Sequence, residues 1–221
     1  MRRSELAAVI DSTLLRPDAT PEDIERLCRE AIKYGFRAVC VNPTYVKLAS
    51  HLLKESKVRT CTVVGFPLGA TLPEVKIYEA KTVIALGADD VDVVINVGAL
   101  KAGNYEVVAK ELEKIVEIAH ENNVVVKAIL ELGLLDEGEK VVACRLARDA
   151  GVDYVKTSTG FGPTGATVQD VRLLRRCVGR RTGVKAAGGI RTLTDALAMI
   201  EAGADLIGTS TAAKIVEKAP P

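Results

Sequence analysis

Residues 86–94 read LGADDVDVV, in which a helical pattern ends, a glycine follows and an apolar run begins. The same order recurs in YGFRAVCV at 34–41, DAGVDYVKT at 149–157 and EAGADLIGT at 201–209. A glycine just past a helix adopts the left-handed conformation without steric cost, and a short apolar run is typical of a parallel strand buried on both faces. The repeated unit is therefore predicted to be a helix followed by a parallel strand.

Outward from these junctions, β-branched runs alternate with helical patterns along the whole chain. Strands are expected at residues 10–14, 38–42, 60–65, 90–96, 124–130, 154–158, 184–187 and 206–209. Helices are expected at 20–34, 74–86, 105–122, 137–150, 168–178 and 193–202, with a further short helix at the N-terminus. Eight such units predict an α/β fold, a (β/α)8 TIM barrel forming a single domain over residues 1–221, with an open doubly wound sheet as the alternative.

Composition narrows the class of protein. The 221 residues include 30 basic and 29 acidic side chains, so the formal charge of +1 gives no field that would attract nucleic acid or an anionic membrane. No run of 18 apolar residues occurs, and no membrane partner is expected. The five cysteines are odd in number and scattered, which is typical of free thiols in a reducing compartment. A cytoplasmic location is expected.

Four charged residues stand inside the expected strands: Asp92, Lys127, Lys156 and Lys185. The interior of a barrel is normally filled by Val, Ile and Leu. Strand alternation could point one carboxylate and three amines from four consecutive strands into a common mouth. Each charge alone could equally be a paired core ion or a strand-end residue reaching solvent. Their occurrence on adjacent strands favours a functional site.

The stretch DYVKTSTGFG at 153–162 places Lys156 in a buried strand with no acidic neighbour expected to neutralise it. Like charges in a pocket of low dielectric push one another toward neutrality, so one lysine should lose its proton. A neutral lysine attacks a carbonyl to form a Schiff base, whose iminium accepts electrons when a carbon–carbon bond breaks. Asp92 would carry protons at such a site. No metal is expected, because the only histidines, His51 and His120, fall on helices away from the strand ends.

Glycine-bearing loops follow the last two strands, AAGGIRT at 186–192 and GTSTAAK at 208–214. Backbone N–H groups and helix N-termini at these positions of a barrel commonly bind phosphate, although a plain turn is the alternative. The candidates are Gly188, Gly189, Arg191, Ser210 and Thr211. A G-x-G-x-x-G pattern at 160–165 does not predict a nicotinamide site, because Lys185 lies where an acidic residue is needed. Gly160 could still contact phosphate.

The chain resembles the deoxyribose-phosphate aldolases, a class I aldolase family, along nearly its whole length. The resemblance rests on IDSTLLRPDAT, VCVNP, VVGFPLGA, GADDVDVVINVGALKAG, VKAILELG, DYVKTSTGFGPTGAT, VKAAGGIRT and GADLIGTST in this order. It implies a (β/α)8 barrel that reversibly cleaves 2-deoxy-D-ribose 5-phosphate to acetaldehyde and D-glyceraldehyde 3-phosphate without a cofactor. It also implies a homodimer or homotetramer that acts on small phosphorylated sugars and aldehydes.

The family's functional residues can be transferred by motif. The resemblance implies that Lys156 forms the Schiff base, that Lys185 keeps its amine uncharged and that Asp92 relays protons. The implied phosphate contacts are Gly160, Gly188, Gly189, Arg191, Gly208 and Ser210. The implied substrate-proximal residues are Thr13, Cys40 and Lys127.

Two features depart from the family's pattern. Ser12 stands where many relatives carry His, and the tail EKAPP lacks the C-terminal tyrosine that some relatives use in proton exchange. Proton transfer is therefore expected to depend on Asp92, Lys185 and water. Two other classes stay open at this stage, a phosphosugar isomerase that uses carboxylate chemistry and a non-catalytic protein that binds a phosphorylated ligand.

Overall fold

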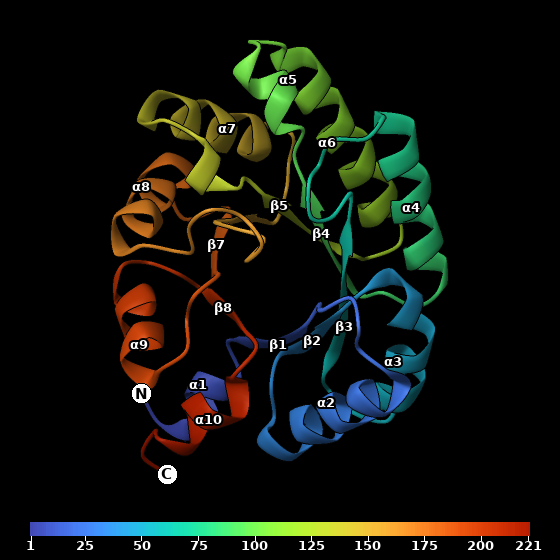
Figure 1. Cartoon of the computed structure of the whole chain (residues 1–221), viewed down its shortest axis with the longest axis vertical. Coiled ribbons are helices and arrows are strands. Elements are labelled where there is room, and N and C mark those ends of the chain that lie inside the picture. Colours follow the sequence, from blue (N-terminus) through green and yellow to red (C-terminus); the bar gives the residue numbers. More distant parts are fainter.

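The computed structural model describes residues 1–221, and its strands form one closed barrel (Figure 1). The eight parallel strands follow chain order around the barrel, and β8 closes on β1. The strands are β1 (Ile10–Leu14), β2 (Ala38–Val41), β3 (Arg59–Val64), β4 (Asp90–Val94), β5 (Val125–Ile129), β6 (Tyr154–Lys156), β7 (Gly183–Ala187) and β8 (Leu206–Thr209). The predicted TIM barrel is confirmed, and the open sheet is excluded because β1 pairs with both β2 and β8.

Helices surround the barrel on its outside. They are α1 (Arg3–Ala7), α2 (Pro21–Tyr34), α3 (Val46–Leu53), α4 (Pro73–Ala85), α5 (Val97–Lys101), α6 (Tyr105–Glu121), α7 (Glu137–Asp149), α8 (Val168–Val178), α9 (Leu193–Glu201) and α10 (Ala212–Glu217). Two 3-10 turns, η1 (Pro43–Tyr45) and η2 (Leu132–Leu134), follow β2 and β5. None of the ten helices combines the length and apolar character that crossing a membrane requires.

The local signals in the sequence account for most of these boundaries. Gly35, Gly87, Gly151 and Gly203, the glycines of the four repeated junctions, have φ angles of 70°, 99°, 86° and 113°. These angles lie in the region that glycine adopts freely, which confirms the predicted helix ends. The predicted helix ranges did not include α3, α5 and α10, although His51, which lies on α3, was expected on a helix. β6 ends at Lys156, two residues earlier than predicted.

Apolar packing is concentrated between the strands and the helices, where 54 buried residues form one cluster. A separate cluster of only five, Leu15, Ala38, Cys40, Cys61 and Val63, involves β2 and β3. Much of the barrel interior is instead occupied by buried charged side chains. A barrel interior is usually apolar. The buried charges therefore mark the interior of this barrel as the region where chemistry is expected.

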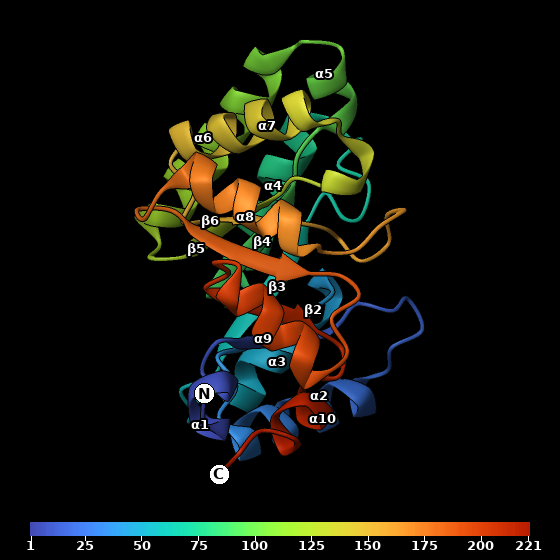
Figure 2. The same ribbon diagram turned by 90° about the vertical axis from the view of Figure 1, so that its left-hand side faces the viewer.

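The chain termini meet at one end of the molecule. Arg3 N donates to Pro220 O at 2.7 Å, and the Arg3 guanidinium donates to Val216 O at 3.1 Å. Figure 2 shows α1 and α10 side by side, with both ends of the chain close to them. The last helix, α10, therefore packs against the first helix, α1.

Candidate active site

A cavity of about 360 Å³ opens at the carboxyl ends of the strands, between the loops that follow β1, β6, β7 and β8. Its position is the one that ligand sites occupy in barrels of this type. Eight of the residues predicted from the sequence line it: Thr13, Lys156, Gly160, Gly188, Gly189, Arg191, Gly208 and Ser210. Asp92, Lys185, Lys127 and Cys40 do not line the cavity, and all four side chains are fully buried.

Lys156 is the last residue of β6, and its side chain is only 3% exposed. Its Nζ donates a hydrogen bond of 2.8 Å to Asp92 Oδ2. The expectation that Lys156 has no acidic partner was therefore wrong. The partner comes from β4, two strands away, and the residues next to Lys156 in the sequence could not reveal it.

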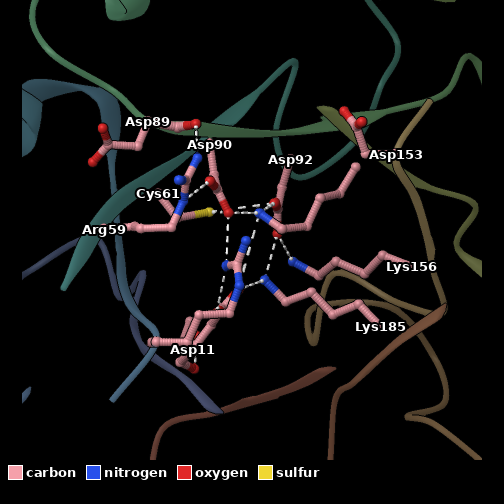
Figure 3. A network of polar contacts seen from close by, with 12 residues as sticks. Asp11, Arg59, Cys61, Asp89, Asp90, Asp92, Asp153, Lys156 and Lys185 are labelled. Carbon is pink, nitrogen blue, oxygen red and sulfur yellow. Dashed lines mark hydrogen bonds and ion pairs between the residues drawn. The ribbon is translucent and has the colours of Figure 1, made fainter. Parts of the chain in front are cut away.

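Asp92 joins the three barrel lysines through one carboxylate, and Figure 3 shows its contacts with Lys156 and Lys185. Its Oδ1 accepts from Lys127 Nζ at 2.8 Å, and its Oδ2 accepts from both Lys156 and Lys185 at 2.8 Å. Burial by itself would raise the pKa of Asp92, but the ammonium groups of Lys127, Lys156 and Lys185 outweigh it and hold the pKa well below its usual value. Asp92 is thus an ionised carboxylate although its side chain is fully buried.

Two of the three lysines have a second carboxylate each. Lys185 Nζ lies 2.6 Å from Asp11 Oδ2, and Lys127 Nζ lies 2.6 Å from Asp90 Oδ2. Burial would lower the pKa of both amines, but these carboxylates, together with Asp92, raise it above the usual lysine value. Lys127 and Lys185 are therefore held as ammonium ions.

The prediction of an excess of positive charge at the open end of the barrel was wrong, because the lysines there are paired with carboxylates. Inside the barrel, three lysines face three aspartates, Asp11, Asp90 and Asp92. Asp90, two residues before Asp92 and thus on the same face of β4, was given no role in the prediction, and Asp11 was missed. The signal for Asp11 was its position in β1, two residues before Thr13 and thus on the same face of the strand.

Register explains why these groups meet. In the parallel ladder, Asp92 of β4 lies opposite Lys127 of β5, and Lys156 of β6 lies opposite Lys185 of β7. The side chains of register partners point to the same face of a sheet. The four charged residues predicted from the sequence are therefore brought together inside the barrel.

The loops after β6, β7 and β8 approach one another backbone to backbone. A side chain at Gly165 would come within 2.4 Å of Gly188 O, and Gly188 itself has a φ of 94°. A Cβ at Gly208 would lie 3.2 Å from Lys185 Cε, so the absence of a side chain there leaves room for the lysine. Gly160, Gly188, Gly189 and Gly208 line the cavity beside Arg191 and Ser210 and form a wall of backbone. Backbone N–H groups of this kind bind anions well.

Comparison with known proteins agrees with this geometry. The model of the DeoC/LacD family of aldolases matches residues 6–218. The chain belongs to the DeoC/LacD family of aldolases. It is 58% identical to deoxyribose-phosphate aldolase of Thermococcus kodakarensis over 100% of this chain and 99% of that protein. It is 54% identical to deoxyribose-phosphate aldolase of Carboxydothermus hydrogenoformans over 97% of this chain and 95% of that protein.

Among solved structures, the aldolase is similar to the deoxyribose phosphate aldolase of Aeropyrum pernix, which is described as having a unique tetrameric structure. The TM-score is 0.91 at 43% identity, covering 97% of this chain and 91% of the other. A further structure, named "QR15, an Aldolase", has a TM-score of 0.92 at 42% identity, covering 96% of this chain and 95% of the other.

The turn after β6 in this aldolase rests on a buried glutamate that was not predicted from the sequence. Glu131 follows β5 with a φ of 50°, a left-handed conformation that is uncommon for a residue with a side chain. Its Oε2 accepts from Thr159 Oγ1 and, at 3.3 Å, from Thr159 N. A side chain at Gly162 would lie 2.7 Å from this carboxylate. Glu131 thereby supports the segment that brings Gly160 to the cavity.

Arg16 is a second residue that the prediction missed. It lines the cavity, as Arg191 does, and its guanidinium pairs with Asp18 at 2.8 Å and with Asp23. Thr211, a predicted phosphate candidate, does not line the cavity. Its Oγ1 instead donates to Arg191 O at 3.3 Å and ties the last two loops together.

Two groups of residues have atoms with metal-ligand spacing, and both include Cys61: Cys40, Cys61 and Asp92, and Asp11, Cys61 and Asp90. Cys40, Cys61 and Asp92 have ligand atoms within 4.8 Å of one another, and Cys40 lies opposite Cys61 in the β2–β3 ladder. However, Asp92 already accepts hydrogen bonds from three lysines, and Cys61 Sγ lies 3.3 Å from Asp92 Oδ1. A cation bound here would face the ammonium groups of Lys127 and Lys185, so the donor set suits an amine-based mechanism better than a metal.

Proposed function

We propose that this aldolase reversibly cleaves 2-deoxy-D-ribose 5-phosphate to acetaldehyde and D-glyceraldehyde 3-phosphate through a Schiff base on Lys156. One observation carries the proposal. Lys156 alone among the barrel lysines lines the cavity, while the amines that share its carboxylate are buried behind it. The deoxyribose-phosphate aldolases with 52–58% identity over the whole chain support the choice of substrate.

The reaction begins when the neutral amine of Lys156 adds to the aldehyde carbon of the open-chain sugar. The former carbonyl oxygen takes up protons and leaves as water, which produces an iminium ion. The hydroxyl group on C3 then loses its proton, the bond between C2 and C3 breaks, and its electron pair enters the iminium to form an enamine. D-Glyceraldehyde 3-phosphate leaves, the enamine takes a proton on C2, and hydrolysis of the resulting iminium releases acetaldehyde.

Asp92 is proposed to exchange protons with the intermediates, together with Lys185 and water. The 2.8 Å contact between Lys156 Nζ and Asp92 Oδ2 supports this role, since a general base must lie within hydrogen-bond reach of the proton it takes. The ammonium group of Lys185 on the same oxygen is proposed to favour the uncharged form of Lys156. Lys127 and Cys40, which are buried and do not line the cavity, are proposed to lie close to the bound substrate.

The substrate phosphate is proposed to bind at the glycine wall of the cavity, with Thr13 near the sugar. The contacts would come from Gly160, Gly188, Gly189, Arg191, Gly208 and Ser210, all of which line the cavity. Binding at this remote group holds the reacting carbons over Lys156 and supplies the orientation that the chemistry requires.

The deciding experiment is a coupled assay for D-glyceraldehyde 3-phosphate released from 2-deoxy-D-ribose 5-phosphate, run with and without a chelator. We expect product in both cases, and none from Lys156→Arg, because a guanidinium stays protonated. The exposed Lys101→Arg is the matched control and should retain activity. Absence of product from the unmodified protein, or loss of product with chelator, would refute the proposal.

We propose further that the aldolase is a cytoplasmic homodimer or homotetramer. The tetramer described for the Aeropyrum pernix relative supports self-assembly, and the five free cysteines are typical of a reducing compartment. Light scattering after size-exclusion chromatography tests the assembly, and a mass of one chain would contradict it.

A further inference from the structure

Arg37 lies just before β2, so it enters the barrel at the amino ends of the strands. The cavity opens at the opposite end, and Arg37 is not among its lining residues. The guanidinium is nevertheless largely buried, with 15% of the side chain exposed. Its Nη1 lies 3.0 Å from Asp11 Oδ1 and 2.7 Å from Asp90 Oδ2. Nothing in the proposed mechanism uses this group.

The contacts divide the three carboxylates unequally among the three lysines. Lys185 contacts both Asp11 and Asp92, at 2.6 and 2.8 Å. Lys127 contacts both Asp90 and Asp92, at 2.6 and 2.8 Å, and its Nζ also lies 3.9 Å from Asp11 Oδ2. Lys156 contacts only Asp92, and it shares that carboxylate with the other two amines (Figure 3). Lys156 is therefore the amine with the least negative charge of its own.

Arg37 forms ion pairs with Asp11 and Asp90, the two carboxylates that Lys156 does not contact. Burial would raise the pKa of Asp11, but Lys185, Lys127 and then Arg37 lower it. Burial would also raise the pKa of Asp90, but Lys127, Arg37 and Arg59 lower it. An arginine stays charged at every pH at which the protein is folded. Its charge therefore balances part of the negative charge in the barrel permanently.

Other charged and polar groups also face Arg37 and its partners. Arg59 Nε, from β3, lies 2.6 Å from Asp90 Oδ1. The guanidinium of Arg37 lies 5.9 Å from the ring centre of Tyr154, the first residue of β6. Arg59 is more exposed than Arg37 and contacts only Asp90 among the three barrel carboxylates. Arg37 is thus the arginine that bridges Asp11 and Asp90.

We propose that Arg37 is a positioning residue for the reaction, which acts from the far end of the barrel by neutralising Asp11 and Asp90 so that Lys156 alone can lose its proton. The proposal rests on the function proposed above. It differs from a structural role in one respect: it requires the charge of Arg37, and not merely its volume or its hydrogen bonds, to reach the amine of Lys156.

The test is the pH dependence of kcat for cleavage of 2-deoxy-D-ribose 5-phosphate. Arg37→Leu removes a positive charge, so the ammonium form of Lys156 gains stability and the acid limb of the profile moves to higher pH, by on the order of one pH unit. The KM at the optimum should change little, because Arg37 does not line the cavity. Arg37→Lys keeps the charge, so its acid limb should lie at the same pH as in the unmodified protein. The exposed Arg29→Leu changes the net charge by the same amount and should not move the acid limb.

A second pair of variants keeps the test valid if Arg37→Leu does not fold. Arg37→Gln retains a donor for the carboxylates but not the charge, and should move the limb in the same direction. Adding Asp90→Asn to either variant removes one negative charge and should move the limb back. An unmoved limb in a folded Arg37→Leu or Arg37→Gln variant, or no return in the double variant, overturns the proposal. If the unmodified protein forms no reducible adduct on Lys156, the proposed function fails instead.

Discussion

Lys156 and Lys185 donate to the same oxygen, Asp92 Oδ2, each at 2.8 Å. The two lysines are register partners on β6 and β7, so the backbone ladder itself sets their separation. Only Lys185 has a further carboxylate, Asp11. When one of the two amines loses its proton, the other can remain charged and bound to Asp92. This difference between two adjacent lysines underlies the first two predictions.

Borohydride reduction in the presence of acetaldehyde should attach a two-carbon group irreversibly to Lys156. The amine of Lys156 lines the cavity, whereas Lys127 and Lys185 are fully buried in ion pairs. Peptide mapping by mass spectrometry identifies the modified lysine. An adduct on another lysine would remove the proposed role of Lys156, and an isomerase that uses carboxylates would keep its activity after this treatment.

Replacing Lys185 with leucine should lower kcat by roughly 100-fold or more. The variant removes the positive charge that contacts Asp92 and Asp11. Lys156 should therefore keep its proton to higher pH, and the acid limb of the pH–rate profile should move to higher pH. The measurement is kcat against pH for Lys185→Leu, with Lys185→Arg as a variant that keeps the charge. A near-normal profile for the leucine variant would mean that burial alone activates Lys156.

Arg191→Leu should raise the KM for 2-deoxy-D-ribose 5-phosphate by roughly 10- to 100-fold and leave the KM for free deoxyribose almost unchanged. A charge-assisted bond to a phosphate contributes about 1.5 to 3 kcal/mol, and the unphosphorylated sugar cannot form it. Steady-state kinetics with both sugars make the comparison, with the exposed Arg172→Leu as control. Equal losses for the two sugars would show that the phosphate binds elsewhere.

The buried pair of Lys76 on α4 and Glu111 on α6 should destabilise the protein when only one partner is removed. Lys76 Nζ lies 2.7 Å from Glu111 Oε1 and 2.8 Å from Val94 O, and both side chains are fully buried. Burial lowers the pKa of Lys76 and raises that of Glu111. For both groups, the cost of losing hydration is therefore larger than the stabilisation that the opposite charge provides. Lys76→Met or Glu111→Leu alone should cost about 3–5 kcal/mol of unfolding free energy.

The double variant Lys76→Met, Glu111→Leu should have a stability close to that of the unmodified protein, or above it, because no buried charge remains unpaired. Urea denaturation of the four proteins completes the cycle. If the two single losses simply add in the double variant, the pair does not behave as a coupled buried ion pair.

Much of the fold was predictable because its signals are local. A helix that ends in glycine, as at Gly87 and Gly151, is encoded by residues adjacent in the chain. Alternation along a strand then shows which side chains share a face, and this placed Asp92, Lys127, Lys156 and Lys185 together. The end of β6 was predicted too late, because Thr157 bonds to neighbouring segments on both sides without extending the ladder.

The ion pairs were not predictable in the same way. Asp11 and Lys185 form a contact of 2.6 Å across 174 positions of sequence, and it exists because β8 closes on β1. Arg37, just before β2, lies 2.7 Å from Asp90 of β4 although β3 stands between these two strands. No pattern within either segment indicates its partner.

The sequence by itself determined the order of strands and helices, the position of the glycine loops and the identity of the amines that face the barrel interior, since each depends on residues a few positions apart. Only the tertiary structure decided which lysines are paired twice and which one shares a single carboxylate. The physical reason is that the state of a buried charge depends on every other charge within a few ångströms, and in a closed barrel those neighbours come from all parts of the chain.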